Sequence, residues 1–176
     1  LPRWRREPLP RYRAVYVFDR SRGGEGNWGL VRKLTAGDGE AGDRFGTSVA
    51  LAGDILVTAA PYADGAADNP TPNQGVAYVF YRNAGGVNNW GQVAKLAASD
   101  GQTYDAFGEK GLSVSGDCAI VPAIREDGGE GDPSPDQGAA YVFCRDWGGQ
   151  NTWGEVARLH APDGESGDHF GSTASM

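Results

Sequence analysis

The chain repeats itself at an interval of 62 or 63 residues, and this repeat limits the possible fold more than any other feature. Residues 14–18 return as residues 76–80 and 139–143, each time with the letters Tyr-Val-Phe at the end. A Trp-Gly pair and then a Phe-Gly pair follow at the same steps, beginning at Trp28, Trp90 and Trp153 and at Phe45, Phe107 and Phe170. Because so many markers keep one register, the chain is built from a repeated structural unit.

Each unit contains four short segments typical of β-strands. They are rich in β-branched and aromatic side chains and are bounded by turn residues. Gly53-Asp54 is typical of a tight hairpin turn, and no segment shows a sustained helical period. The sequence therefore predicts an all-β fold in which a four-stranded antiparallel meander, the blade of a β-propeller, recurs every 62–63 residues. In the unit that begins at Phe45, the predicted strands are residues 45–51, 55–60, 76–81 and 92–96.

The predicted blades do not close into a ring. Two are complete, at residues 45–98 and 107–161, and two are partial, at residues 14–36 and 169–176, while residues 1–13 form a separate basic arm. Closed propellers have four to eight blades, and an open array would leave sheet edges exposed. We therefore expect other copies of the chain, or missing blades of a longer chain, to complete the partial ones.

The order Phe-Gly, Gly-Asp, a short apolar strand, then Gly-x-x-Tyr-Val-Phe resembles the FG-GAP repeat of integrin α-chain propellers. It is more similar to bacterial versions carrying Trp-Gly-x-Val-x-x-Leu and Asp-Gly-x-x-x-Asp-x-Phe-Gly, and the resemblance covers residues 14–176. It implies a propeller-type fold and a binding or structural role outside the cell. The integrin calcium loop, Asp-x-Asp-x-Asp-Gly before strand two, is absent here, where only Asp54 and Asp117 stand. That metal site is therefore not carried over.

A different acidic loop, Asp-Gly-x-x-x-Asp, precedes each Phe-Gly pair. Paired carboxylates on a glycine-bearing loop, beside backbone carbonyls, are hard oxygen ligands suited to Ca²⁺. Alternatively, the aspartates form Asx-turns that shape the entry to the following strand. The candidate calcium ligands are Asp38, Asp43, Asp100, Asp105, Asp163 and Asp168.

Two long loops, residues 62–75 and 124–138, carry a hydroxyl residue between two prolines. Thr71 and Ser134 hold these places, one repeat apart. Hydroxyls flanked by proline on extended loops are typical of O-glycosylated segments. The alternative is a stiffened, exposed turn.

The two cysteines, Cys118 and Cys144, have their midpoint at residue 131, which is also the centre of the loop 124–138. Directly opposed residues of an antiparallel hairpin have a constant midpoint, so the cysteines should face each other and form a disulfide. One repeat earlier, Ile55 and Tyr81 hold these positions. The alternative is a pair of free, half-buried thiols. A disulfide would place the protein in an oxidising compartment.

The distribution of charge and the types of side chain present argue against nucleic-acid binding, a transmembrane helix and catalysis. The net charge is −7, with +4 on residues 1–13 and −11 on the rest, so the folded part would repel nucleic acid. No apolar run approaches the length of a transmembrane helix. The two histidines, His160 and His169, lie in no metal-ligand or nucleophile arrangement, so no catalytic residue is assigned and we expect no enzyme.

These observations favour a non-enzymatic structural or adhesive module, extracellular or at the cell surface, and a subunit of a head-to-tail assembly or filament. Its expected partners are other copies of itself, missing blades, glycans or cell-surface proteins. The alternative is a lectin-like, carbohydrate-binding propeller with the repeated tryptophans on its sugar-binding surface. The fixed place of Trp28, Trp90 and Trp153 in each repeat favours packing between blades instead.

Overall fold

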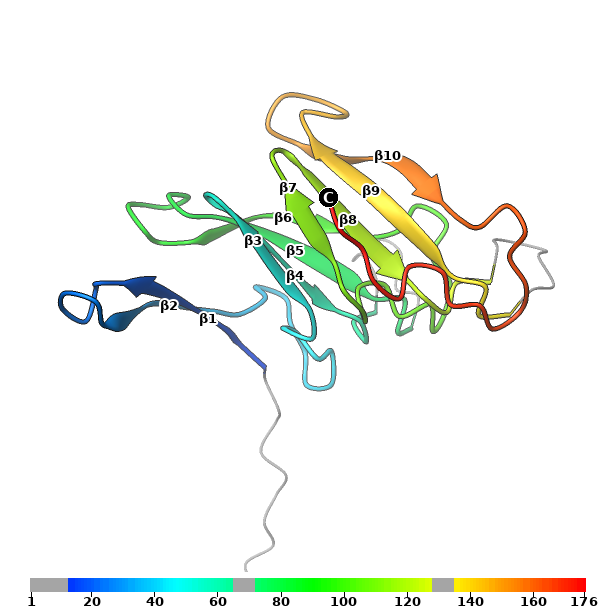
Figure 1. Cartoon of the computed structure of the whole chain (residues 1–176), viewed down its shortest axis with the longest axis horizontal. Helices are drawn as coiled ribbons and strands as arrows, with labels where there is room; N and C mark the ends of the chain where they lie inside the picture. Colours follow the sequence, from blue (N-terminus) through cyan, green and yellow to red (C-terminus); the bar gives the residue numbers. More distant parts are fainter. Residues whose placement is uncertain (1–12, 65–71, 128–134) are drawn as a thin grey trace, which may run out of the picture.

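The computed structural model describes residues 13–64, 72–127 and 135–176. In those ranges the chain forms ten β-strands in three antiparallel sheets and contains no helix (Figure 1). The all-β prediction is therefore confirmed. The first sheet is a ribbon of two strands, β1 (Val15–Arg20) and β2 (Trp28–Leu34).

The other two sheets have four strands each and are meanders. One has the order β3-β4-β5-β6 and the other the order β7-β8-β9-β10, as predicted for the two complete blades. The strands of the second sheet are β3 (Val49–Ala52), β4 (Ile55–Ala60), β5 (Val76–Tyr81) and β6 (Gly91–Leu96). Those of the third are β7 (Ser113–Ser115), β8 (Cys118–Ala123), β9 (Ala139–Arg145) and β10 (Trp153–Leu159).

The first strand of each repeat is shorter than the sequence predicts. Residues 45–51 were expected to be extended, but β3 begins at Val49. Gly46 has a φ of 85°, and its N–H donates to the carbonyl of Ala59, so the chain turns before it pairs. The segment 169–176 forms no strand; it makes a single parallel bridge between Thr173 and Gly111. A β-strand is stabilised by hydrogen bonds to a neighbouring strand. β4 provides this neighbour for β3, but among the described residues no strand pairs with the segment 169–176.

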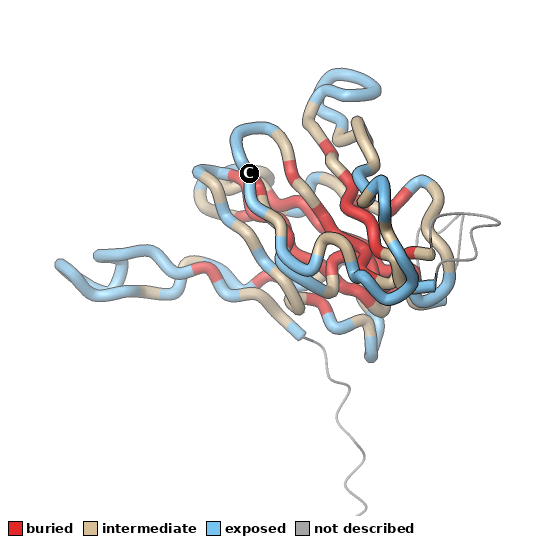
Figure 2. Tube along the Cα trace, turned by 45° about the vertical axis from the view of Figure 1, so that its right-hand side comes forward, coloured by how far each residue is buried: buried red, intermediate tan, exposed pale blue. Residues whose placement is uncertain are grey.

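Side chains of β5 divide the core in two, because successive residues of a strand point to opposite faces. Ala77 and Val79 join the cluster between the second and third sheets, while Tyr78 and Phe80 join the cluster facing the ribbon β1–β2. Figure 2 shows buried chain concentrated where the sheets face one another. The sheets therefore stack face to face, as blades do.

The repeated tryptophans occupy different environments. Trp90 is buried in the cluster between the ribbon and the second sheet, and the indole N–H of Trp153 donates to the hydroxyl of Tyr81 at 2.8 Å. The predicted packing between blades is confirmed for these two. Trp28, on the ribbon, is 67 % exposed, because no described sheet lies against that face.

A disulfide joins β8 to β9, as predicted. Cys118 and Cys144 are direct partners in the antiparallel register, and their Cα atoms lie 4.1 Å apart. Ile55 and Tyr81 form the same cross-strand pair in the second sheet. The cysteines therefore replace a complete apolar contact with a covalent one.

Replacing both cysteines with serine should lower the free energy of unfolding by about 3 kcal/mol, because the bond restricts the unfolded chain. Denaturant melts of the wild type with and without reductant provide the measurement. A Cys118→Ile/Cys144→Tyr variant, which restores the pair of the preceding repeat, is the control and should recover part of the loss. Melts unaffected by reductant would contradict the prediction.

Candidate functional site

The acidic loops lie between successive repeats, and their first aspartate contacts the repeat that follows. Asp38 accepts hydrogen bonds from the hydroxyl of Tyr78 at 2.9 Å and from Nζ of Lys95 at 2.7 Å. One repeat later, Asp100 accepts a hydrogen bond from Tyr141 at 2.7 Å, and its other oxygen lies 2.9 Å from Arg158. We call this arrangement the Asp–Tyr–cation contact. It occurs twice, with lysine as the cation in one case and arginine in the other, at spacings that differ by one residue.

These contacts change the proton affinities of their members. Burial raises the pKa of both Tyr78 and Tyr141, and the hydrogen-bonded aspartate raises it further, so both hydroxyls stay protonated and donate. Burial alone would raise the pKa of Asp38, but the hydrogen bonds from Lys95 and Tyr78 outweigh it and hold that pKa below its ordinary value. Asp38 is therefore an ionised acceptor.

The second aspartate of each loop binds the loop's own backbone. Asp43, Asp105 and Asp168 each accept a hydrogen bond from the N–H three residues earlier, at 2.7, 2.6 and 2.8 Å. These carboxylates shape the backbone of the loop, but not as Asx-turns, in which the side chain would accept from the N–H two residues later. Among the described residues, no three side chains of His, Cys, Asp or Glu gather as a metal site would require. Calcium binding at these loops stays a prediction.

Asp105 differs from its counterparts because it is buried. Asp105 is 2 % exposed. Its burial raises the pKa of the carboxyl group to about 7, and repulsion from Glu126, Asp127 and Asp100 contributes to the increase. Glu126 is also buried and pairs with Arg158 at 2.7 Å. In the preceding repeat, Ala63 stands where Glu126 does. The buried Asp105 of the loop between the second and third sheets is therefore near the ion pair of Glu126 with Arg158, and the glutamate of that pair has no counterpart in the preceding repeat.

A glutamine that the sequence patterns did not single out links successive repeats. The side-chain N–H of Gln74 donates to the carbonyl of Ala98 at 3.1 Å, and its backbone carbonyl accepts from the N–H of Phe107 at 3.0 Å. A Cβ on the next residue, Gly75, would lie 2.6 Å from backbone atoms of Phe107, so only glycine fits there. Gln137 repeats the backbone hydrogen bond, accepting from the N–H of Phe170, but its side-chain N–H donates to the carbonyl of Gly164, three residues past the counterpart of Ala98. The pair Gln-Gly, which lies directly before β5 and again directly before β9 but not before β1, was the available signal.

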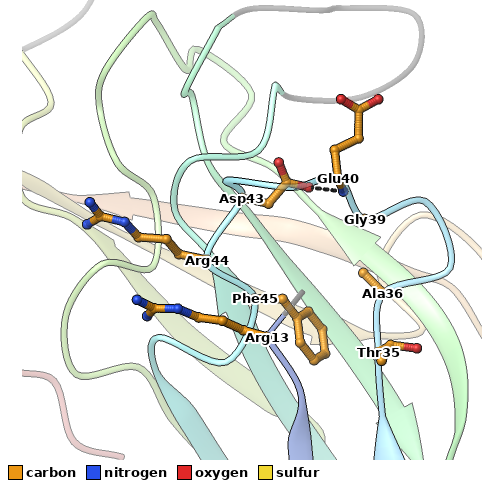
Figure 3. A pocket seen from close by; sticks show the side chains of 8 residues that line it. All are labelled: Arg13, Thr35, Ala36, Gly39, Glu40, Asp43, Arg44 and Phe45. Carbon is orange, nitrogen blue, oxygen red and sulfur yellow. Dashed lines mark hydrogen bonds between the residues drawn. The ribbon is translucent and has the colours of Figure 1, made fainter. Parts of the chain in front are cut away.

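A pocket of about 210 Å³ lies beside the first acidic loop (Figure 3). Ala36, Gly39 and Phe45 line it, and their counterparts one repeat later surround Gln74. Tyr12, the residue at the glutamine's position in the first repeat, lies outside the described residues, as do the rest of the basic arm up to residue 12 and the predicted glycosylation sites Thr71 and Ser134. The pocket therefore marks the place that an amide side chain fills in the other repeats.

Removing one hydroxyl tests the Asp–Tyr–cation contact. Tyr141→Phe should lower the free energy of unfolding by about 2 kcal/mol, because it removes a buried hydrogen bond to a carboxylate. Tyr16→Phe is the matched control: Tyr16 holds the same strand position but is 51 % exposed, and the change should cost little. Equal losses in urea melts would contradict a special role for Asp100.

Titration of stability tests Asp105. With a pKa raised from 3.8 to about 7, the folded protein binds more protons than the unfolded chain between those values, so the free energy of unfolding should fall as pH rises through this range. Asp105→Asn keeps the acceptor and should remove this fall, stabilising the protein by about 2 kcal/mol at pH 8. Asp43→Asn, at the less buried counterpart, should do less.

Repeating the melts with CaCl₂ and with chelator tests calcium binding. Calcium would stabilise the wild type and not Asp105→Asn.

Comparison with known proteins agrees with this architecture. The family model described as FG-GAP repeat matches residues 28–80, 90–143 and 153–176. Each range begins at a Trp-Gly pair and contains a Phe-Gly pair, and the first two end at a Tyr-Val-Phe segment. No curated protein matches the chain. In the part of the chain that is described, no helix has the length and apolar character needed to cross a bilayer. On the strength of the three matched ranges, the chain belongs to the FG-GAP repeat family.

Proposed function

We propose that this chain is a non-enzymatic structural or adhesive module that works outside the cell as part of a larger propeller-type assembly. Other copies, or blades of a longer chain, supply what its partial blades lack. Partners at the cell surface would bind the loops of the completed assembly.

The exposed face of the ribbon β1–β2 carries this proposal. Tyr16 and Phe18 are 51 % and 52 % exposed, whereas Tyr78 and Phe80, at the same places in the next repeat, are 1 % and 3 % exposed. Contiguous exposed apolar surface marks interaction sites, and two residues that are two apart on one strand lie on the same face of it. This face has the composition of a blade interface, and a protein partner would bury it.

Two further observations support the remaining parts of the proposal. The carboxylates of the first two acidic loops contact tyrosine, lysine, arginine or backbone groups, a use that fits holding repeats together. The disulfide between Cys118 and Cys144 and the FG-GAP repeats are compatible with an extracellular protein.

The solution state of the protein tests the proposal. Sedimentation velocity over a wide concentration range, with electron microscopy of the same samples, should give large or filamentous species. A glycan array tests the carbohydrate-binding alternative, which the exposed Trp28 and Tyr16 favour because aromatic faces stack on sugars. A monodisperse small species that binds glycans, and loses them on Trp28→Ala, would replace the proposal.

A further inference from the structure

We infer that the ribbon β1–β2 of one copy binds residues 160–176 of a second copy, head to tail, through the contacts that join successive repeats within the chain. This inference rests on the proposed structural role and names the surfaces that carry it. Three matched pairs of residues, one member at each end of the molecule, support it.

The first pair is a divided Asp–Tyr–cation contact. Tyr16 and Lys33 lie on the ribbon with Lys33 Nζ 5.9 Å from the ring centre, much as Lys95 lies 5.8 Å from that of Tyr78. At the other end of the molecule, Asp163 occupies the position of Asp38 and Asp100 and is exposed. One end therefore presents the tyrosine and the cation, and the other presents the carboxylate.

The second pair is aromatic. The ring of Phe45 lies 5.6 Å from that of Tyr78 and 6.1 Å from that of Phe80, and Phe107 repeats this packing in the third sheet. Phe170 holds the same place after its own acidic loop and is only half-buried. Tyr16 and Phe18 are the counterparts of the two rings that it would contact, and they are exposed on the ribbon.

The third pair changes chemistry at both ends together. Within the chain, Gln92 accepts a hydrogen bond from the N–H of Gly37 at 3.1 Å, and Glu155 accepts one from the N–H of Ser99 at 3.0 Å. The next N–H position in this series is Pro162, which has no N–H to donate. The corresponding acceptor position on the ribbon is Leu30, which has no acceptor. Leu30 and Pro162 would form an apolar contact in place of the hydrogen bond. The ribbon therefore matches residues 160–176 at this position, where neither side leaves a donor or acceptor without a partner.

One copy cannot make these contacts with itself. Figure 1 places the ribbon and the Asp163 loop at opposite ends of the molecule, with both four-stranded sheets between them. The joint blade would combine β1 and β2 of one copy with residues 169–176 of another. No described segment of either half corresponds to β4, so the two halves do not form one continuous sheet. The two copies are held together by side-chain contacts between their faces.

Charge reversal tests the inference in sedimentation velocity. Lys33→Glu and Asp163→Lys should each raise the dissociation constant of the assembly about tenfold or more, because each places like charges together. Mixing the two variants should restore assembly, since each contact in the mixture then joins opposite charges. The matched control is Arg32→Glu, which makes the same change of charge at an exposed neighbouring residue of β2 and should assemble as the wild type does.

The outcomes separate this inference from the proposed function. If the wild type assembles and both variants assemble as Arg32→Glu does, this contact is wrong and the structural role stands. Failure of the mixture to recover would also overturn the contact. A wild type that stays monomeric at every concentration would overturn the contact and the self-assembly part of the proposed function, and would leave blades of a longer chain as the source of the missing strands. Circular dichroism melts of the variants, expected to match the wild type because both side chains are exposed, exclude unfolding as the cause.

Discussion

Face-to-face contact between sheets is the interaction on which the rest of this structure depends. In β5, alternate side chains enter two different clusters, so both faces of one sheet are needed by its neighbours. A single repeat would therefore leave one apolar face in water, which is why repeat proteins gain stability from stacking. Tyr78 and Tyr16 hold the same strand position in successive repeats. Tyr78 is buried because the ribbon β1–β2 lies against it, and Tyr16 is exposed because no described strand pair lies against its face.

Polar groups at the margins of these interfaces set the position of one sheet on the next. The carboxylate of Asp100 contacts β9 through Tyr141 and β10 through Arg158. Gln74, just before β5, binds Ala98 and the following Phe-Gly turn. Each hydrogen bond has a fixed geometry, whereas apolar contact alone would tolerate sliding. The close approach at Gly75 adds a steric condition to the same junction. Burial of apolar area stabilises the stack, and these few polar contacts fix the position of one sheet relative to the next.

Much of the fold could be predicted because it is encoded in local patterns that recur. The strands β4 and β5, the Gly53-Asp54 hairpin and the pairing of Cys118 with Cys144 follow from alternation, turn chemistry and a constant midpoint. The short β3 could not be predicted, because the turn at Gly46 depends on a hydrogen bond to Ala59 in another strand. The bulge at Val79/Phe80 is likewise invisible to a period-two pattern.

The site was harder to predict, since the role of a carboxylate depends on what lies opposite it. The aspartates of the acidic loops were identified from the sequence, but their partners Tyr78 and Lys95 lie about 40 and 57 residues away, and the pattern gave no sign of them. The buried pair of Glu126 with Arg158 occurs in one repeat only and so left no recurring signal.

The single disulfide makes the stack unequal along its length. It covalently joins β8 to β9, in the sheet farthest along the chain, while the ribbon β1–β2 has one neighbouring sheet and no covalent link. In a linear array, the resistance of a unit to local opening depends on its neighbours and its own cross-links. Fraying should therefore start at the ribbon and progress toward β8, so that an isolated molecule carries a rigid anchor at one end and an adaptable strand pair at the other.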